Sequence, residues 1–234
     1  MMRTRYRLAA ERAAGREVLE VACGAGQGAG LLLQTARRVV IGDYTRALVQ
    51  AARAHYRDRV PALCLDAQAL PFEASSFDLV ILFEALYYLD RPEQFLAECQ
   101  RVLRPGGEVL ICNANPEWSG FNASPFSTRY YTAAELQQLL EGCGFAVTLF
   151  AAFPEGTASA RGRLVGSVRR TAVALHLIPH SMRGKELLKR LFYGQLMRMP
   201  AELTDEGPVE ELVPLESPSA AAGYKVIYAL ARRA

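Results

Sequence analysis

The sequence predicts an α/β protein built around a parallel sheet, and three observations support this. Five short apolar runs recur along the first half of the chain, at 18–21, 39–41, 62–65, 79–83 and 109–112. Stretches with helical spacing of apolar residues lie between most of them, which is the pattern of βαβ units. A glycine-rich turn follows the first run, where such sheets commonly bind ligands.

The helical stretches follow in chain order. Residues 46–56 form the first, and 92–103 form the second, with Phe95 and Cys99 on one apolar face. The sequence RPGG at 104–107 predicts the end of that helix and a turn. A further helix is expected over 133–143, because Thr132 and Glu135 form a capping-box pattern. Strands are expected at 146–150 and 224–230.

The composition changes between these last two strands. Residues 161–177 and 185–199 have helical patterns, whereas 204–219 is acidic with three prolines and predicts a loop. We therefore expect a core at 1–153 plus 223–234 and a helical insert at 154–222. Because both flanking strands meet the ligand-binding edge, the insert is interpreted as a substrate lid. The alternative is packing against the outside of the sheet.

Overall composition narrows the class of protein. The 234 residues carry a net charge of +3, too small to indicate nucleic acid as a partner. The five cysteines are isolated, so buried thiols in a reducing cytoplasm are expected rather than disulfides. The Arg-rich start has no apolar segment typical of a signal peptide, and no run reaches the ~18 apolar residues of a membrane span. A cytoplasmic location is the expectation.

The first apolar run leads into EVLEVACGAGQG at 17–28. Gly24 and Gly26 allow a tight turn and close approach of backbone to a ligand, a feature that dinucleotide sites share. Glu20 precedes the glycines, and a carboxylate there favours an ammonium-bearing ligand over a pyrophosphate. No Lys or Arg lies between Arg16 and Arg37 to hold phosphate.

Two more acids follow the next two strands. Asp43 comes 19 residues after Gly24 and suits the hydroxyls of a ribose, in an adenosyl ligand or in NAD. Asp66 follows the third strand and suits an adenine amino group, with the Ala67 N–H beside it. Asp is also common in solvated turns, but three acids at successive strand ends favour one ligand site.

With these pieces in order, the chain resembles the class I S-adenosylmethionine-dependent methyltransferases, in the branch that includes quinone, sugar and small-metabolite enzymes. The matching motifs are VLEVACGAG at 18–26, IGD at 41–43, DAQALPF at 66–72, SFD at 76–78 and RVLRPGG at 101–107. The resemblance implies a Rossmann-like seven-stranded sheet in the order 3-2-1-4-5-7-6, with the last strand antiparallel and helices on both faces.

The resemblance also implies a cofactor, S-adenosylmethionine, and S-adenosylhomocysteine as its product. Tyr44 would lie beside the adenine and Phe83 would offer backbone to the amino acid part. Arg5 and Tyr6 resemble an Arg-Tyr pair of this branch that reaches the cofactor carboxylate. The implied cofactor-binding set is Arg5, Tyr6, Glu20, Ala22, Gly24, Gly26, Asp43, Tyr44, Asp66, Ala67 and Phe83.

The acceptor side departs from the family pattern. Many relatives carry Glu-x-x-Glu-His after the fourth strand, but EALYY stands at 84–88 here. A His base and a metal ion at that place are therefore not expected. The catalytic candidates are Tyr88, His176 and His180, since an oxygen nucleophile must lose a proton, whereas His55 is expected to be structural. The NPEW sequence at 115–118 follows the fifth strand, so a base-modifying loop is rejected.

The insert bears on the substrate. Residues 161–200 hold nine Lys or Arg and one acid. The amphipathic stretch at 181–199 is typical of a solvated charged face with its apolar side on the protein body, and the functional alternative is an anionic substrate or peripheral membrane contact. An aromatic wall is expected from Phe121, Phe126, Tyr130 and Tyr131.

Methylation of a hydroxyl on a small, glycan-like or lipid-linked acceptor is the favoured function. An NAD-dependent oxidoreductase and a non-catalytic adenosyl-binding protein remain as alternatives, and no oligomeric state is predicted.

Overall fold

The structure is a computed structural model, and it describes residues 1–155 and 200–233. The two helices expected within the insert, the 181–199 stretch, His176 and His180 all lie outside these residues. The chain divides into two compact units, one of Met1–Pro154 with Ala201–Ala234 and one of Glu155–Pro200. The first unit contains every strand named below.

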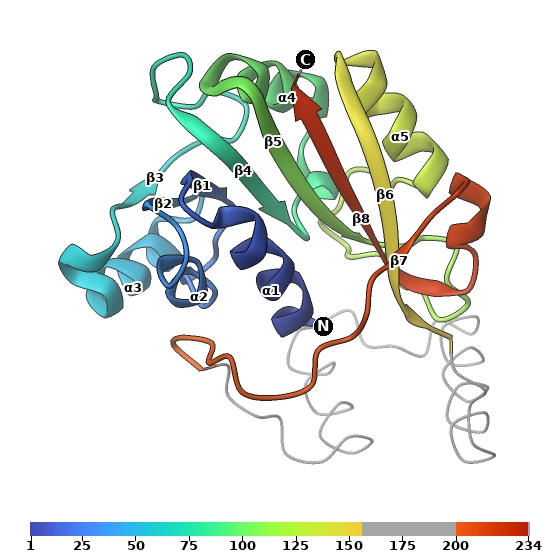
Figure 1. The fold of residues 1–234 in the computed structure, drawn as a ribbon, viewed down its shortest axis with the longest axis horizontal. Coiled ribbons are helices and arrows are strands. Elements are labelled where there is room, and N and C mark those ends of the chain that lie inside the picture. The colour runs from blue at the N-terminus through green and yellow to red at the C-terminus, as the bar shows by residue number, and fades with distance from the viewer. Residues whose placement is uncertain (156–199, 234) are drawn as a thin grey trace. The chain divides into compact units, whose positions relative to one another are not determined.

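An eight-stranded sheet forms the centre of this unit, in the order β3-β2-β1-β4-β5-β8-β6-β7 (Figure 1). Neighbours from β3 to β5 are parallel, and β8 runs antiparallel to both β5 and β6. The expected seven-strand order is thereby confirmed. The strands are β1 Glu17–Val21, β2 Arg38–Asp43, β3 Ala62–Cys64, β4 Phe77–Phe83, β5 Leu103–Ala114, β6 Phe145–Pro154, β7 Val213–Pro214 and β8 Tyr224–Arg233.

The extra strand, β7, corrects the expectation of a loop over 204–219. It is two residues long and pairs with Phe150 and Ala151 at the edge of the sheet. Its acidic, proline-rich surroundings hide it in the sequence, because proline in a sheet is confined to edges and cannot extend a ladder.

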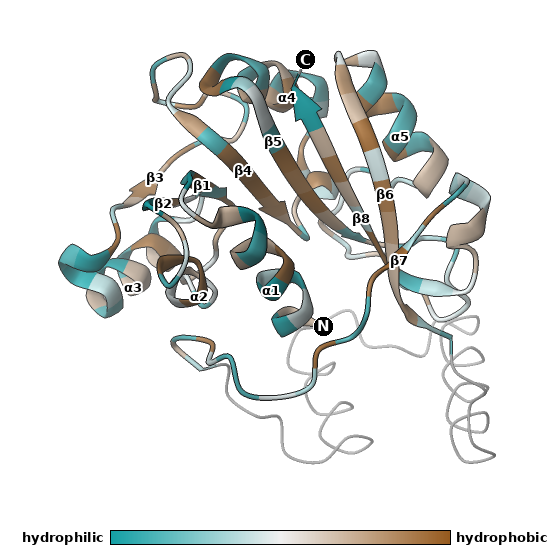
Figure 2. Ribbon diagram, viewed as in Figure 1, coloured by the Kyte–Doolittle hydropathy of each residue, from teal (hydrophilic) through white to brown (hydrophobic). Residues whose placement is uncertain are grey.

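Helices cover both faces of the sheet, as expected. Alternate residues of β4 divide between two cores: Leu79 and Ile81 pack toward one face, Val80 and Leu82 toward the other. β4 and β5 are coloured as hydrophobic along most of their length (Figure 2), as expected of strands that helices cover on both faces. One face carries α1 Met2–Ala13, α2 Ala29–Leu33 and α3 Arg46–Tyr56, and the other carries α4 Pro92–Val102 and α5 Ala133–Gly142.

The first helix, α1, was not expected from the sequence. Its buried face is narrow, formed by Tyr6, Ala9 and Ala13 at helical spacing, with Thr4 beside it. Four arginines on the same twelve residues mask this pattern. The helix brings Tyr6 to Glu20 of β1 and Arg5 to Glu84, directly after β4.

Two expected boundaries can be compared with the structure directly. The capping box of α5 is confirmed, since Thr132 Oγ1 accepts from Glu135 N at 3.2 Å and Glu135 accepts from Thr132 N at 2.9 Å. The expected end of the helix before 104–107 is confirmed, since α4 ends at Val102, but the expected turn is wrong, because β5 already begins at Leu103. A register shift against β4 between Phe77 and Leu79 accommodates these residues, as a bulge does.

The insert expected from the sequence includes residues 201–222. In the structure these residues belong to the same compact unit as the core. Leu203 N donates to Gln27 O at 2.7 Å, and Leu215 N donates to Leu149 O at 3.0 Å. Glu202 accepts from Arg59 at 2.7 Å and pairs with His55 at 2.8 Å. The lid interpretation concerns the remaining part of the insert and stays a prediction.

Two expectations concern membrane-spanning segments and the state of the cysteines. None of the helices in the described ranges is long and apolar enough to cross a membrane. All five cysteines are free. The expectation of buried thiols holds for Cys23, Cys99 and Cys112, whereas Cys64 is exposed and Cys143 is half-buried.

Candidate functional site

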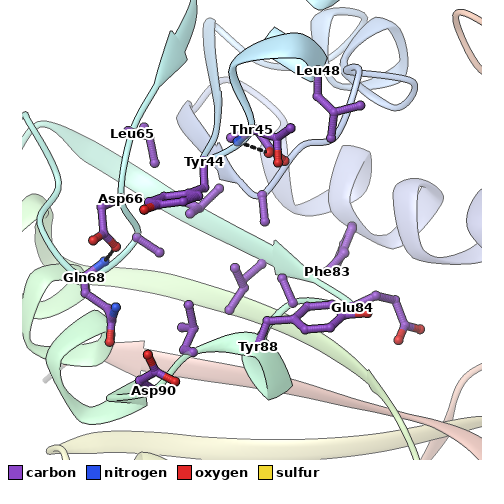
Figure 3. A pocket seen from close by; sticks show the side chains of 17 residues that line it. Tyr44, Thr45, Leu48, Leu65, Asp66, Gln68, Phe83, Glu84, Tyr88 and Asp90 are labelled. Carbon is purple, nitrogen blue, oxygen red and sulfur yellow. Dashed lines mark hydrogen bonds between the residues drawn. The ribbon is translucent and has the colours of Figure 1, made fainter. Parts of the chain in front are cut away.

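A cavity of about 630 Å³ opens at the carboxyl ends of β1, β2 and β4 (Figure 3). This is the edge at which open parallel sheets bind ligands. Its lining is Val21, Ala22, Asp43, Tyr44, Thr45, Leu48, Leu65, Asp66, Ala67, Gln68, Leu82, Phe83, Glu84, Ala85, Tyr88, Leu89 and Asp90.

The cavity brings together most of the predicted site. Those that line it are Ala22, Asp43, Tyr44, Asp66, Ala67, Phe83 and Tyr88. The others that the structure describes, Arg5, Tyr6, Glu20, Gly24 and Gly26, are not among the lining residues, although Arg5, Tyr6 and Gly24 contact residues that are. Their contacts, given below, show how they support the walls.

Asp43 ties the end of β2 to the glycine loop. Its Oδ2 accepts from Gly24 N at 2.9 Å and its Oδ1 accepts from Thr45 N at 2.8 Å. Each carboxylate oxygen can accept more than one hydrogen bond, so Asp43 keeps capacity for a ligand hydroxyl while it is held in place. Thr45 was missed from the sequence, although its position directly before α3 makes it a recognisable N-cap residue.

The glycine loop is shaped by the residues beneath it. A Cβ at Gly26 would lie 3.0 Å from both the Ile41 side chain and the Tyr56 ring, and the Gly26 φ is +81°. The Tyr56 hydroxyl donates to Gly26 O at 2.7 Å and accepts from Gly30 N at 3.1 Å. Ala22, with φ of +57°, adopts a left-handed conformation at the start of the loop. The loop backbone is therefore fixed before any ligand arrives.

Glu20 is buried behind this loop, with 1% of its surface exposed. Its Oε1 accepts a hydrogen bond from the Tyr6 hydroxyl, and its Oε2 has no partner in the described part of the chain. Burial raises the pKa of Glu20 to about 7, against the lowering effects of Tyr6 and Arg5. The structure thus pairs Tyr6 with Glu20, while its predicted contact with a cofactor carboxylate stays a prediction.

The opposite end of the cavity is polar and open. Asp66 Oδ1 accepts from Gln68 N at 2.8 Å, and Tyr44 is 78% exposed. The Tyr44 ring lies above Asp66, with Gln68 and Asp90 below (Figure 3). Gln68 and Asp90 were missed from the sequence. Only the position of Gln68, two residues after Asp66, gave a signal, since Asp commonly turns the chain in this way.

Glu84 directly follows β4 and lines the cavity. It was not selected from the sequence as a site residue. It adopts φ of +53°, an uncommon conformation that concentrates at functional sites. Arg5 Nη1 lies 3.5 Å from its carboxylate, and the Tyr87 hydroxyl donates to it at 3.0 Å. Burial and the neighbouring Glu84 raise the pKa of Tyr87 far above its usual value, so Tyr87 stays protonated and acts as a donor.

Aromatic rings continue from this point. Tyr87 stacks on Tyr130 with centroids 4.3 Å apart, and Phe121 meets Tyr130 edge-on at 4.6 Å. Tyr88, 45% exposed, packs against Tyr87 and reaches the cavity. The expected aromatic wall needs correction in two places. Tyr131 belongs to the buried core, and Phe126 is 78% exposed.

All the charged side chains that line the cavity, among the described residues, are acidic. Four carboxylates line it, those of Asp43, Asp66, Glu84 and Asp90, and no Lys, Arg or His does within the described ranges. No group of three or more His, Cys, Asp or Glu that could hold a metal ion occurs in residues 1–155 and 200–233. His55 is engaged by Glu202, away from the lining, as expected for a structural residue.

Comparisons with known proteins agree with this geometry. Residues 19–111 match the family described as Methyltransferase domain. A probable S-adenosylmethionine-dependent methyltransferase of Mycolicibacterium smegmatis is 41% identical over 169 residues, 70% of this chain and 65% of the relative. A protein of the same description from Mycobacterium tuberculosis, Rv3030, is 35% identical over 144 residues, 60% of this chain and 52% of the relative. The chain thus spans between half and two thirds of the length of these curated relatives.

Solved structures show the same fold. The [4+2]-cyclase SpnF superposes with a TM-score of 0.63 at 21% identity, covering 97% of this chain and 79% of that protein. Taken together, the strand order, the acids at the strand ends and the match over residues 19–111 show that this chain has the fold of a class I methyltransferase, and its similarity to S-adenosylmethionine-dependent methyltransferases indicates S-adenosylmethionine as the cofactor.

Proposed function

We propose that this protein transfers a methyl group from S-adenosylmethionine to a hydroxyl of a small, glycan-like or lipid-linked acceptor. The observation that carries the proposal is the set of acids at the ends of β1, β2 and β3 around one cavity that no basic side chain of the described ranges lines. S-adenosylmethionine bears a sulfonium, an ammonium and two ribose hydroxyls. These groups are stabilised by carboxylates.

The residues fit this cofactor part by part. Asp43, already held by two backbone N–H groups, would accept the ribose hydroxyls. Asp66 and the Ala67 N–H would meet the adenine edge beneath Tyr44. Glu20 would accept the ammonium group, since its Oε2 is the buried acceptor without a partner among the described residues. The glycine loop would pass beside the methionine part without obstruction from side chains.

The bound cofactor supplies a methyl group activated by a positively charged sulfur. The protein must then align the acceptor, exclude water and receive the acceptor's proton. Tyr88 and the Tyr87–Tyr130 stack offer an aromatic surface next to the cavity for the acceptor. Glu84 lines the cavity and is a candidate for the proton acceptor, with Tyr88, His176 and His180.

An anionic acceptor and peripheral membrane contact are further proposals, and both rest on the basic residues of 161–198. The cavity lining itself offers an anion no basic side chain within the described residues. Arg5 lies outside the lining but is 3.5 Å from the carboxylate of Glu84, which lines the cavity.

A rival function needs the same fold but no methyl transfer. A binding protein would hold the cofactor without using it, and a structural neighbour described as a cyclase has this fold as well. An NAD-dependent enzyme would account for the glycines and Asp43, but not for Glu20 or Asp66. Because fold alone does not fix the reaction, cofactor binding and methyl transfer must be tested separately.

Calorimetric titration with S-adenosylmethionine, S-adenosylhomocysteine and NAD tests the cofactor, with Asp43→Ala as the variant. Asp58→Ala, an exposed acid outside the cavity, is the matched control. We expect both adenosyl ligands to bind to the wild type and the control but not to Asp43→Ala. Binding of NAD alone would overturn the proposal. Transfer of a labelled methyl group to a panel of hydroxyl-bearing acceptors then separates an enzyme from a binding protein.

A further inference from the structure

Tyr6 occupies a position between the glycine loop and the cavity wall. Its ring meets Phe83 edge-on, with centroids 5.3 Å apart, and Phe83 lines the cavity. A Cβ at Gly28 would lie 1.9 Å from the Tyr6 ring. Glycine at position 28 is therefore required by Tyr6 itself. The ring is fixed from both sides, which fixes the direction of its hydroxyl.

That hydroxyl donates to Glu20, fourteen residues away on β1. Tyr6 is 6% exposed and Glu20 is 1% exposed, so water does not compete for this bond. The second oxygen, Glu20 Oε2, is buried and accepts no hydrogen bond from the described residues. Leaving a buried acceptor unpaired costs free energy, so the site lacks one donor.

The location of Glu20 indicates which donor is missing. The next two residues, Val21 and Ala22, both line the cavity, so Glu20 stands directly behind its wall. An ammonium group carries three N–H donors and the charge that a carboxylate requires. The adenosine part of a ligand carries no such cation.

We infer that Tyr6 is a positioning residue, whose hydroxyl fixes Glu20 so that Oε2 receives the ammonium group of the bound adenosyl amino acid. This inference rests on the proposed function. It adds that α1 contributes to the cofactor site through the Tyr6 hydroxyl. Selection for the amino acid end of the ligand then depends on a hydroxyl that does not line the cavity.

The charges around Glu20 give this arrangement a pH dependence. The groups that face Glu20 are Tyr6 and Arg5 from α1, Cys23 from the glycine loop, Asp43 from β2 and Tyr56 from α3. Burial raises the Glu20 pKa to about 7, and the Tyr6 hydrogen bond lowers it. Loss of the Tyr6 hydroxyl raises this pKa further. The ammonium-bearing ligand then binds well only at higher pH.

The test compares two ligands that differ at the amino acid end. S-adenosylhomocysteine has the ammonium group, and 5′-methylthioadenosine has the same adenosine and thioether without it. We expect Tyr6→Phe to weaken S-adenosylhomocysteine roughly tenfold at pH 7, because a hydrogen bond to a charged acceptor is lost. The affinity for 5′-methylthioadenosine should change by less than about twofold, since that ligand does not use this bond.

Tyr56→Phe is the matched control, since Tyr56 is another buried tyrosine whose hydroxyl bonds the glycine loop. It should affect both ligands equally. In a Glu20→Gln background, which itself weakens only S-adenosylhomocysteine, Tyr6→Phe should add no further selective loss. The pH at which S-adenosylhomocysteine affinity levels off should also move upward in Tyr6→Phe.

The outcomes separate the two proposals. If neither ligand binds to the wild type, the proposed function and this inference fail together. If Tyr6→Phe weakens both ligands to the same extent, or weakens neither, the inference fails while the proposed function stands. Selective loss that persists unchanged in the Glu20→Gln background would also overturn it, because Tyr6 would then act on the ligand without Glu20.

Discussion

The two ends of the parallel strands use the same side chains in opposite ways. At the amino ends, acids are paired with arginines: Arg104 contacts Asp78 at 2.9 Å, and Arg37 contacts Glu17 at 2.8 Å. At the carboxyl ends, Asp43 and Asp66 accept from backbone N–H groups. Glu20 accepts from one tyrosine hydroxyl. Glu84 is the exception among the described acids of this edge, since Arg5 lies 3.5 Å from it.

The difference teaches which acids serve the fold and which serve a ligand. An acid paired with arginine is neutralised inside the protein, whereas an acid held by neutral donors has no paired cation and can meet the charge or donors of a ligand. Substitutions at the amino ends should therefore change stability without changing ligand affinity. Substitutions at the carboxyl ends should change ligand affinity, and one of them should stabilise the protein.

Asp43→Asn should give the largest effect. The variant loses the charge that holds the Gly24 and Thr45 N–H groups and that we propose to meet the ribose. Hydrogen bonds to a charged acceptor contribute about 1.5–3 kcal/mol, so we expect roughly 100-fold weaker S-adenosylhomocysteine binding by calorimetry. A change below about threefold would mean that Asp43 only supports the loop.

Glu20→Gln should stabilise the ligand-free protein at pH 8 by about 2 kcal/mol. Burial raises the folded-state pKa of Glu20 to about 7. The wild type therefore loses stability as pH rises from the unfolded-state pKa through 7, because a buried carboxylate must ionise. Urea unfolding at pH 5 and pH 8 measures this. The prediction is contradicted if the gap between variant and wild type does not widen with pH.

Asp78→Asn should lower stability by about 1–2 kcal/mol at pH 7, through weaker bonds with Glu17 N and Arg104. Partial burial raises the Asp78 pKa, but these two partners outweigh it and hold the pKa below its usual value. This stabilisation is present above the unfolded-state pKa and disappears as pH falls through the folded-state pKa. Variant and wild type should converge in acid, with ligand affinity unchanged at pH 7.

Arg37→Ala should give the smallest effect, about 0.5 kcal/mol or less in urea unfolding. Arg37 is 62% exposed, and Glu17 keeps its contacts with Arg38 and Arg104. A larger loss would mean that the arginines around Glu17 act as one cooperative network. In that case the amino end is more than a set of separate ion pairs.

The sequence locates the buried parts of the fold well. The parallel strands are apolar on both sides because helices cover both faces, and such runs are visible without alignment. Elements with a weak apolar signature were missed. In α1 the buried face consists of small residues among arginines, and β7 is two residues long with a proline.

The candidate site divides in the same manner. Asp43, Asp66 and the glycines follow strands and are found by their spacing. The pairing of Tyr6 with Glu20 depends on how α1 packs across β4 and the glycine loop, and no local pattern encodes that packing. Glu84 likewise gains its position from a left-handed backbone conformation that its residue type does not predict.

The pairing of β6 with β8 has a consequence for how this protein can diverge. Pro154 and Tyr224 are direct partners in the antiparallel ladder, and β7 pairs with β6 beside them, so the chain returns to the sheet close to where it leaves. Replacing Glu155–Pro200, the second compact unit, by a segment of another length leaves both the β6–β8 and the β6–β7 ladders intact. Because each doubling of loop length costs only about 0.6 kcal/mol of closure entropy, this junction is a natural place for new sequence to be acquired or exchanged between relatives.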